Sequence, residues 1–445
     1  AIDFYHSLLE TDLGAESQAQ LEQQLRTRGL FFGDRPLCSV LRPRFLSADQ
    51  YRFLHRQVTV LLGALARTYQ AAQSNPVFRR QFGLMDWEED LVIHDPGFED
   101  PSPVSRLDAF FSPERGGLRF TEYNAETPAG AAFCDLLSYV FLGLPVMREF
   151  LRRFEIRPQP ARHHVQHALI RSYRHWSGRR DTPHVAILDW REVPTFAEFR
   201  ITAEYLESQG IPCTIADPRE VEYRDGKLFY RDFHINVIYK RVLIRELIER
   251  GGRDHPVVRA VLDGAACMVN PFRCKILHKK ATLAVLTDER NHALFTSGER
   301  SVIERHIPWT RIVEERCTLF HEHEIDLLPY IAEHRDRFVL KPNDEYGGAG
   351  IVLGWECDSE KWARSVQAAV GNNYVVQERV ALPIESFPVS VGGRVEFVDR
   401  MLDTAPFVFH GAYMDGCLTR LSGAGLINVS AGEASSVPTF IVEGR

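Results

Sequence analysis

Residues 184–242 alternate between strand-like and helix-like segments, and this order constrains the fold more than any other stretch. Two apolar runs, HVAILDW and IPCTIAD, are typical of buried strands, and between them TFAEFRITAEYLESQ is typical of a helix that ends at Gly210. INVIYKRV is a further strand, preceded by an Asp-Gly turn in VEYRDGKLFY. The order strand–helix–strand predicts a small α/β domain with a parallel sheet. Because no G-x-G-x-x-G follows the first strand, we do not expect a dinucleotide site there.

Composition restricts the class of protein. At about 150 residues per domain, 445 residues predict two or three domains. The net charge of −7 gives no broad basic excess, so we expect no nucleic-acid partner. No stretch approaches the roughly 18 apolar residues that cross a bilayer, so we expect no membrane partner. The eight scattered cysteines and the lack of a signal-like start favour a reduced, cytoplasmic protein.

The first hundred residues are predicted to be mostly helical, with one strongly amphipathic helix. Ser47 and Gln50 form a capping box, and an apolar face then recurs at helical spacing. That face consists of Leu54, Val58, Leu61, Leu62 and Leu65. A breaker-rich linker, DPGFEDPSP, follows at 95–103. Thr127 and Pro128 then predict the start of another helix, AGAAFCDLLSYVFLG.

Two short β-like segments, SRLDAFF and GLRFTEYN, are separated by SPERGG and predict a hairpin. Side chains two apart on a strand share a face, so paired strands would bring Asp108, Glu122 and Asn124 together. Two carboxylates and an amide oxygen are ligands suited to a Mg²⁺ ion that also holds phosphate. Arg106 would lie beside that charge and stabilise a transferring phosphoryl group. The alternative is a surface hairpin of mixed charge.

A glycine-rich loop lies in FVLKPNDEYGGAGIVLGWE, residues 338–356. A strand ends at Lys341, the loop carries Gly347, Gly348 and Gly350, and a second strand returns. Glycines let backbone N–H groups approach phosphate closely, and the lysine adds a positive charge. The P-loop order is absent. The alternative is an ordinary glycine hairpin turn.

The strand YVVQERV, residues 374–380, runs into Gln377 and Glu378. Such a strand can present backbone groups to an adenine edge, while the carboxylate accepts a hydrogen bond from an amine or a ribose hydroxyl. The alternative is a strand that leaves the core with polar residues at its end.

Together these segments are the parts of an ATP site, and the set resembles the ATP-grasp enzymes. It is most similar to the circularly permuted branch that includes the synthetase half of glutathionylspermidine synthase. In ordinary ATP-grasp proteins the metal carboxylates follow the glycine loop. Here R-x-D and E-Y-N precede the loop by more than two hundred residues. The loop NDEYGGAG differs from that of the glutathionylspermidine enzyme and no amidase domain is present, so glutathione and spermidine are not expected as substrates.

The resemblance implies a role for each motif. Arg106 would stabilise the transferring phosphate, and Asp108, Glu122 and Asn124 would bind Mg²⁺. Lys341 and a second lysine, Lys280 with Lys275 as the fallback, would contact the ATP phosphates beneath a lid that carries Gly347, Gly348 and Gly350. Gln377 and Glu378 fall where the family contacts adenine and ribose.

The resemblance also implies an α/β and α+β multidomain fold, in which the chain is divided into five parts. The expected parts are a helical region (1–95), the metal-binding part of the core (96–150), a pre-ATP-grasp-like α/β domain (151–264), a lid and nucleotide-binding subdomain (265–380) and the C-terminal part of the core (381–445).

The implied activity is that of an ATP- and Mg²⁺-dependent carboxylate–amine ligase that forms an amide through an acylphosphate. The expected substrates are a small-molecule or peptide carboxylate and an amine. An ATP-dependent phosphotransferase and a non-catalytic nucleotide-binding regulatory or scaffold protein are the alternatives. The sequence does not identify the substrates or the oligomeric state.

Four further features of the sequence lie outside this set of motifs. His163 and His167 have the i,i+4 spacing of zinc ligands, but the surroundings favour a solvated basic helix, or one that meets an anion. HEHE, residues 321–324, was interpreted as a helix start. The small residues of 418–436 and Arg420 either close over a ligand near the ATP site or belong to a C-terminal loop. Cys134 lacks a histidine partner in the sequence and is not predicted to be a nucleophile.

Overall fold

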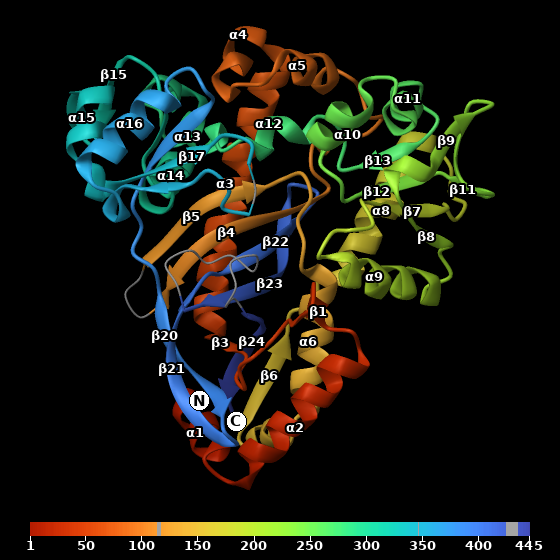
Figure 1. The fold of residues 1–445 in the computed structure, drawn as a ribbon, viewed down its shortest axis with the longest axis vertical. Coiled ribbons are helices and arrows are strands. Elements are labelled where there is room, and N and C mark those ends of the chain that lie inside the picture. Colours follow the sequence, from red (N-terminus) through yellow and green to blue (C-terminus); the bar gives the residue numbers. More distant parts are fainter. Residues whose placement is uncertain (114–116, 346, 424–434) are drawn as a thin grey trace.

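The computed structural model describes residues 1–113, 117–345, 347–423 and 435–445. It is a mixed α/β multidomain structure, with a large sheet at the centre and two smaller units on either side of its upper end (Figure 1). The two chain ends lie near each other at the opposite end of the molecule (Figure 1).

The long helix α3, Ala48–Ser74, crosses the molecule behind the central sheet (Figure 1). The predicted capping box is present: Ser47 Oγ accepts the Gln50 N–H at 3.2 Å, and Gln50 Oε1 accepts the Ser47 N–H at 2.8 Å. The predicted apolar face of α3 is buried in the largest core cluster. The other elements of this region are α1 (Ile2–Leu9), α2 (Asp12–Thr27), β1 (Phe31–Phe32), β2 (Arg35–Pro36), α4 (Pro76–Arg79) and α5 (Asp86–Val92).

The central sheet brings together strands from both ends of the sequence. Its main order is β20-β21-β23-β22-β4-β5, and β24 joins β23 to β3 and β6. Because β22 pairs with β4, the C-terminal strands lie directly beside the predicted hairpin. The bounds are β3 (Arg44–Ser47), β4 (Val104–Ser112), β5 (Gly117–Asn124), β6 (Phe154–Pro158), β20 (Ile384–Val391), β21 (Arg394–Leu402), β22 (Ala405–Phe409), β23 (Tyr413–Ser422) and β24 (Ser435–Gly444). Helices α6 (Ala131–Gly143) and α7 (Pro145–Phe150) follow the hairpin.

The α/β unit has the parallel sheet that the sequence predicts, in the order β13-β12-β7-β8. Asp225 and Gly226, both with positive φ, form the predicted turn in a separate antiparallel sheet, β11-β10-β9. The strands are β7 (Val185–Leu188), β8 (Cys213–Ala216), β9 (Val221–Arg224), β10 (Lys227–Tyr230), β11 (Phe233–Ile235), β12 (Val237–Lys240) and β13 (Cys267–Val269). The helices are α8 (Arg162–Ser177), α9 (Phe196–Ser208), α10 (Ile244–Gly251) and α11 (Pro256–Leu262).

The third unit is an antiparallel sheet in the order β14-β19-β17-β18, with helices around it. Its strands are β14 (Thr310–Ile312), β17 (Phe338–Pro342), β18 (Val352–Leu353) and β19 (Tyr374–Glu378), and β15 (Cys317–Phe320) pairs with β16 (His323–Asp326). The helices are α12 (Cys274–His278), α13 (Ala281–Thr287), α14 (Ser297–His306), α15 (Leu327–Glu333) and α16 (Ser359–Ala369).

Helix α6 begins later than predicted, at Ala131 instead of after Thr127. The cap is supplied by another helix: Glu198 Oε1 on α9 accepts the N–H of Gly130 at 2.7 Å and of Ala132 at 3.3 Å. A carboxylate at a helix N-terminus satisfies free N–H groups and complements the helix dipole. The start of α6 therefore depends on a tertiary contact.

The segment CKILHKKATLAVLTDERN forms two helices, although one was predicted. The chain breaks at Lys279 because Asn343 binds the next turn: its carbonyl accepts the Lys280 N–H at 3.0 Å, and its side chain accepts the Ala281 N–H at 2.8 Å. Two further predictions were wrong. The strand expected over GIVLGWE is confined to β18. HEHE was expected to start a helix, but it begins at His321, which has a positive φ, and leads into strand β16.

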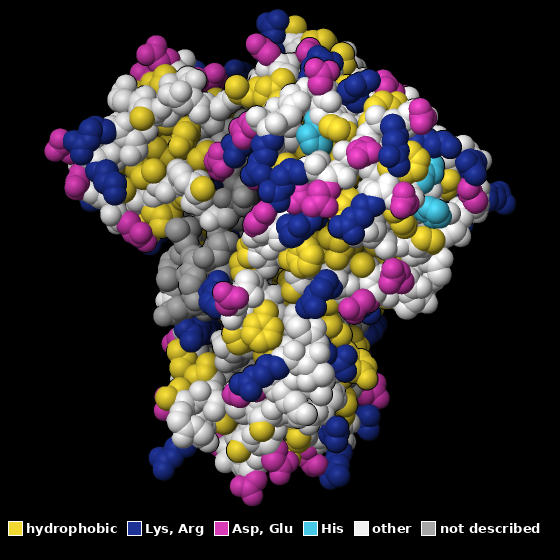
Figure 2. Space-filling model, turned by 45° about the vertical axis from the view of Figure 1, so that its right-hand side comes forward, with side chains coloured by type: hydrophobic (Ala, Val, Ile, Leu, Met, Phe, Trp, Pro, Cys, Tyr) yellow, Lys and Arg dark blue, Asp and Glu magenta, His cyan; other side chains and the backbone are white. Residues whose placement is uncertain are grey.

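Three features of the described residues concern membranes, thiols and surface charge. Among the described residues, no helix is both long and apolar enough to cross a membrane. All eight cysteines are described and unpaired, and Cys317 is the exposed one. On the face in Figure 2, basic and acidic side chains are interspersed rather than gathered into one area.

Asp189, at the carboxyl end of β7, generates a prediction about pH and stability. Burial raises its pKa from 3.8 to about 7, against the opposing effects of the Trp190 N–H and Arg241. The folded state therefore holds this proton more tightly than the unfolded chain, and the resulting stability is lost as pH rises towards 7. Asp189→Asn removes the titration and keeps an acceptor for the Trp190 N–H, which lies 2.8 Å away.

We expect the thermal midpoint of Asp189→Asn to rise relative to that of the wild type between about pH 5 and about pH 8, as followed by circular dichroism. The same substitution at the exposed Asp399, on β21, is the control. A wild-type–variant difference that does not change with pH would show that Asp189 is not the titrating group.

Candidate functional site

The hairpin β4–β5 places four polar side chains on one face. Asp108 lies directly opposite Glu122, and Arg106 lies opposite Asn124. Directly opposed residues of an antiparallel pair share a face and lie about 5 Å apart at Cβ. The strand pairing that the sequence predicted is therefore confirmed, and with it the convergence of these side chains.

Asp108 is the most strongly bound acid of the group. Arg106 donates to both carboxylate oxygens, at 2.7 and 3.0 Å, and Asn124 Nδ2 donates to Oδ2 at 2.9 Å. Arg420 on β23 also donates to Oδ2, at 2.7 Å. Burial favours the neutral acid, but Arg106 and then Arg420 outweigh it, so the pKa of Asp108 lies well below its usual range. Asp108 is therefore an anion at any physiological pH.

The sequence did not indicate Asp403, and it gave a place near the ATP site only as one of two alternatives for Arg420. Arg420 binds Asp403 through its Nε at 2.6 Å while it contacts Asp108. Its only sign in the sequence was its place among the small residues of 418–436, and residues 424–434 of that stretch lie outside the described part of the chain. Asp403 gave no signal, because a single acid after a strand is common.

Two lysines approach the hairpin from the third unit. Lys280 Nζ lies 3.1 Å from Glu122 Oε1. Burial raises the pKa of Glu122, but Lys280 reverses this effect and the pKa falls below its ordinary value. Burial lowers the pKa of Lys341 to about 8, although the charge of Glu122 opposes the shift. Lys280 and Lys341 thus face the same acid, as the predicted phosphate-binding lysines would.

A cavity of about 410 Å³ connects these groups. Such a volume is in the range of small-molecule sites. Its polar lining includes Asp108, Glu122, Lys341, Gln377, Glu378 and Arg420. Its apolar lining includes Val339, Ile351, Leu353, Trp355, Leu382 and Met401. The cavity can therefore take a molecule with a flat apolar part and an anionic part.

Gln377 and Glu378 line the cavity in different ways. Gln377 is buried; its Oε1 accepts from Lys341 at 2.7 Å, and its Nε2 donates to Thr310 at 3.1 Å. The side chain of Gln377 therefore orients Lys341. Glu378 lies at the rim, 3.3 Å from His321. The predicted contacts of this pair with adenine and ribose remain predictions.

The glycine loop stands beside the cavity. Gly347, Gly348 and Gly350 have φ angles of 67°, 79° and 70°, which favour glycine. A Cβ on Gly350 would lie 2.7 Å from Pro342. The three glycines are not among the described residues that line the cavity, whereas Ile351 is. Their predicted contact with phosphate remains a prediction.

A second buried cluster contains Lys275, the fallback phosphate lysine. Glu126, His278 and Asp344 have donor atoms within 4.8 Å of one another, a spacing that a metal ion could use. However, Lys275 Nζ lies 3.2 Å from Glu126 and 2.5 Å from Asp344, so its ammonium group already lies between the two acids. Lys240 also pairs with Glu126, and Lys279 with Asp344. The cluster is an ion-pair network, and Lys280 is the lysine that lies against Glu122.

No family model and no curated protein matches this chain. Among solved structures, it is similar to the glutathione synthetase-like effector GSS30 from Globodera pallida, in its apo form. The identity is 14%, the TM-score is 0.60, and the match covers 97% of this chain and 98% of that chain. At this identity the likeness concerns the fold, which the two chains share over nearly their full lengths.

The buried network predicts a difference between the two lysines. Lys275→Met leaves three buried acids, Glu88, Glu126 and Asp344, with two lysines, Lys240 and Lys279. One buried charge is then uncompensated, so we expect a loss of about 3–5 kcal/mol in the free energy of unfolding. Lys280→Met, with one acid partner that opens on the cavity, is expected to cost less. Urea unfolding followed by fluorescence compares the two variants. Equal losses would contradict the assignment of Lys275 to structure.

Proposed function

We propose that this protein is an ATP- and Mg²⁺-dependent ligase that joins a carboxylate to an amine, on a circularly permuted ATP-grasp fold. One observation carries the proposal. Residues from segments more than two hundred positions apart, Glu122 on β5 and Lys341 on β17, line a single cavity that has both charged and apolar walls. The fold likeness to a protein named as glutathione synthetase-like supports the same class.

The oxygen atoms of the hairpin fit a Mg²⁺ ion. Of the four hydrogen bonds to Asp108, three go to Oδ2 and one to Oδ1, which leaves acceptor capacity on Oδ1. Within the described residues, Glu122 Oε2 and Asn124 Oδ1 accept no hydrogen bond. Asp108, Glu122 and Asn124 would hold the ion, which neutralises phosphate charge when bound.

Arg106 and Arg420 would have different roles. Arg106 donates to Asp108 and, through Nη1, to the Ala129 carbonyl at 2.7 Å, so it holds the hairpin acid in place. Arg420 lines the cavity and can reach a ligand there. We retain Arg106 beside the transferring phosphoryl group and add Arg420 as the cation that faces it.

The reaction has two steps. A substrate carboxylate oxygen forms a bond to the γ-phosphorus as the bond to the β-phosphate oxygen breaks, which gives an acylphosphate and ADP. The amine nitrogen then bonds to the carbonyl carbon, phosphate leaves with the C–O electron pair, and the amine proton passes to solvent. Lys280 and Lys341 would hold the phosphates in line, and the glycine loop would exclude water that hydrolyses the acylphosphate.

A non-catalytic nucleotide-binding protein is the second candidate, and one observation favours it. Asp108 already takes four hydrogen bonds in this structure, so a metal ion must use its remaining capacity or displace a donor. A phosphotransferase would use the same cavity, but no contact in the described residues favours it over ligation.

Metal dependence tests the catalytic proposal. We expect ADP and phosphate release in the presence of Mg²⁺ and a mixture of amino acids, peptides and polyamines. Glu122→Gln should lower this turnover by about 100-fold or more, because a metal ion contributes several kcal/mol to phosphoryl transfer. Glu396→Gln, the same change at an exposed position of β21, is the control.

The products separate the candidates. Ligation requires both substrates and releases free phosphate, whereas phosphotransfer leaves a phosphorylated product. Nucleotide binding without turnover identifies the non-catalytic protein, and an absence of ATP binding in the presence of Mg²⁺ contradicts all three.

Nucleotide affinity tests the lysine assignment separately. A buried charged hydrogen bond to phosphate contributes about 1.5–3 kcal/mol, so Lys341→Met should raise the Kd for a non-hydrolysable ATP analogue by about 10- to 100-fold. Isothermal titration calorimetry measures the change, with Lys361→Met on the exposed side of α16 as the control. An unchanged Kd would place the phosphates elsewhere.

A further inference from the structure

The start of helix α8 carries a histidine pair that the proposed activity does not use. His163 and His164 lie in the first turn, and their ring centroids are 3.7 Å apart. Adjacent helical residues ordinarily point in different directions, so this proximity is unusual. Asp415 on β23 completes the group: His164 Nε2 lies 2.8 Å from Asp415 Oδ2. One donor atom from each of the three residues lies within 4.8 Å of the others.

The surroundings orient the donors. Tyr413 Oη lies 3.1 Å from His164 Nδ1, so the other ring nitrogen, Nε2, faces Asp415. Asp415 Oδ1 accepts the Gly416 N–H at 2.9 Å, which leaves Oδ2 towards the histidines. Metal-bound histidines commonly have such an outer partner on the second nitrogen. His163 is exposed and, among the described residues, takes no hydrogen bond.

We propose that His163, His164 and Asp415 bind a transition-metal ion of the Zn²⁺ type, at a site distinct from the proposed Mg²⁺ site. Two imidazoles and one carboxylate suit Zn²⁺, Co²⁺ or Ni²⁺, whereas Mg²⁺ prefers oxygen ligands. Zn²⁺ lies about 2.0–2.2 Å from such ligands, so small side-chain rotations bring all three within reach. The exposed side of His163 leaves room for a water ligand.

The local cations do not occupy this position. In the Glu126 cluster a lysine lies between the acids, whereas Arg162, in the same turn as the histidines, has its guanidinium over the Tyr205 ring at 4.1 Å. Among the described residues, Asp415 forms an ion pair with His164 and with no lysine or arginine.

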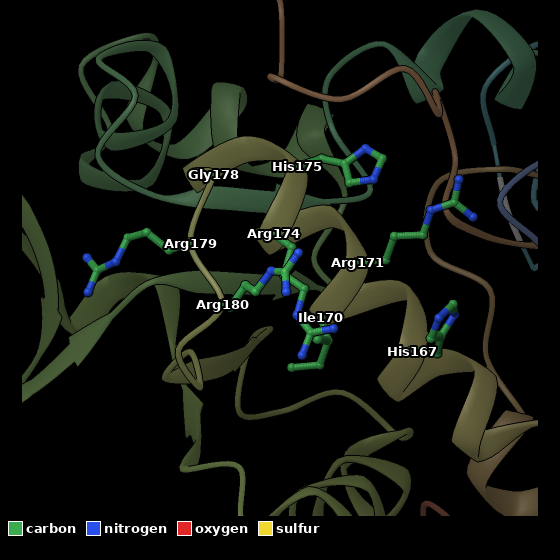
Figure 3. A pocket seen from close by; sticks show the side chains of 8 residues that line it. All are labelled: His167, Ile170, Arg171, Arg174, His175, Gly178, Arg179 and Arg180. Carbon is green, nitrogen blue, oxygen red and sulfur yellow. The ribbon is translucent and has the colours of Figure 1, made fainter.

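The later part of α8 was the alternative location for a ligand. A hollow of about 660 Å³ is lined there by His167 and by arginines of the helix end. Figure 3 shows Arg171 and His167 on one side of the hollow and Arg179 on the other, with Arg174 and Arg180 between them. His167 pairs with His410 at 3.3 Å, so it is not the partner of His163 that i,i+4 spacing suggested.

A metal ion at this position would join two units. His163 and His164 belong to the helix of the α/β unit, and Asp415 lies on the strand that carries Arg420. Five residues of extended strand span about 17 Å, so the metal would lie well outside the cavity while holding the strand that enters it.

Cobalt binding to the full chain tests the proposal. After treatment with a chelator and in excess Mg²⁺, the wild type should bind one equivalent of Co²⁺ with visible absorption bands. His163→Ala and Asp415→Asn should each weaken Co²⁺ binding by about 100-fold or more, and Tyr413→Phe by about tenfold, as outer partners typically do. Equilibrium dialysis and absorption titration give both values.

The controls separate this site from other histidines and from the Mg²⁺ site. His175→Ala, at an exposed position of the same helix, and Glu122→Gln, at the proposed Mg²⁺ site, should leave Co²⁺ binding unchanged. Because His163 is exposed, its substitution should also leave the circular dichroism spectrum unchanged. A wild type without cobalt bands, or a His163→Ala variant that binds as tightly as the wild type or loses no more than His175→Ala, would overturn the proposal.

Discussion

The structure depends on one buried anion, the carboxylate of Asp108. It accepts hydrogen bonds from Arg106 on its own strand, from Asn124 on the adjacent strand and from Arg420, which is 312 residues away. Removing one partner from a buried ion pair typically lowers the free energy of unfolding by about 3–5 kcal/mol. The positions of these three strands therefore depend on one another. The proposed ligand-binding face exists because β4, β5 and β23 converge on this charge.

A short segment, residues 125–130, connects the central sheet to the α/β unit through polar contacts. Asn270 at the end of β13 donates to the carbonyls of Val104, Ala125 and Glu126, at 2.7 to 2.9 Å. Lys240, at the end of β12, lies 3.3 Å from Glu126. The carboxyl edge of the parallel sheet therefore contacts the segment that follows the hairpin, and the two units share a polar interior in which Lys240 pairs with Glu126.

Much of this arrangement could be predicted from sequence where the cause is local or periodic. The parallel sheet follows from alternating segments, the start of α3 from a capping box, and the shared face of Asp108 and Glu122 from the two-residue period of a strand. The failures have distant causes. Glu198 sets the start of α6, and Asn343 breaks the helix at Lys279, so neither boundary is encoded nearby. The sequence left two alternatives for Arg420, a contact with a ligand near the ATP site or a C-terminal loop, because its acid partners Asp108 and Asp403 are distant in sequence. The resemblance assigned Lys280 to the ATP phosphates, and the structure places it against Glu122, but neither the sequence nor the structure shows what the cavity binds.

Strand β24 has a consequence for how such a chain comes to be folded. It pairs with β23, β3 and β6. The central sheet therefore lacks an inner strand until residues 435–444 have been synthesised. Contacts between distant segments form slowly. Until they form, the unpaired strand edges are prone to aggregation. On the ribosome, the α/β unit can complete its parallel sheet early, whereas the hairpin acids must await Arg420. During synthesis, the polar interior around Asp108 therefore stays incomplete until the C-terminal strands emerge. We expect chaperones to bind the nascent chain mainly during this interval.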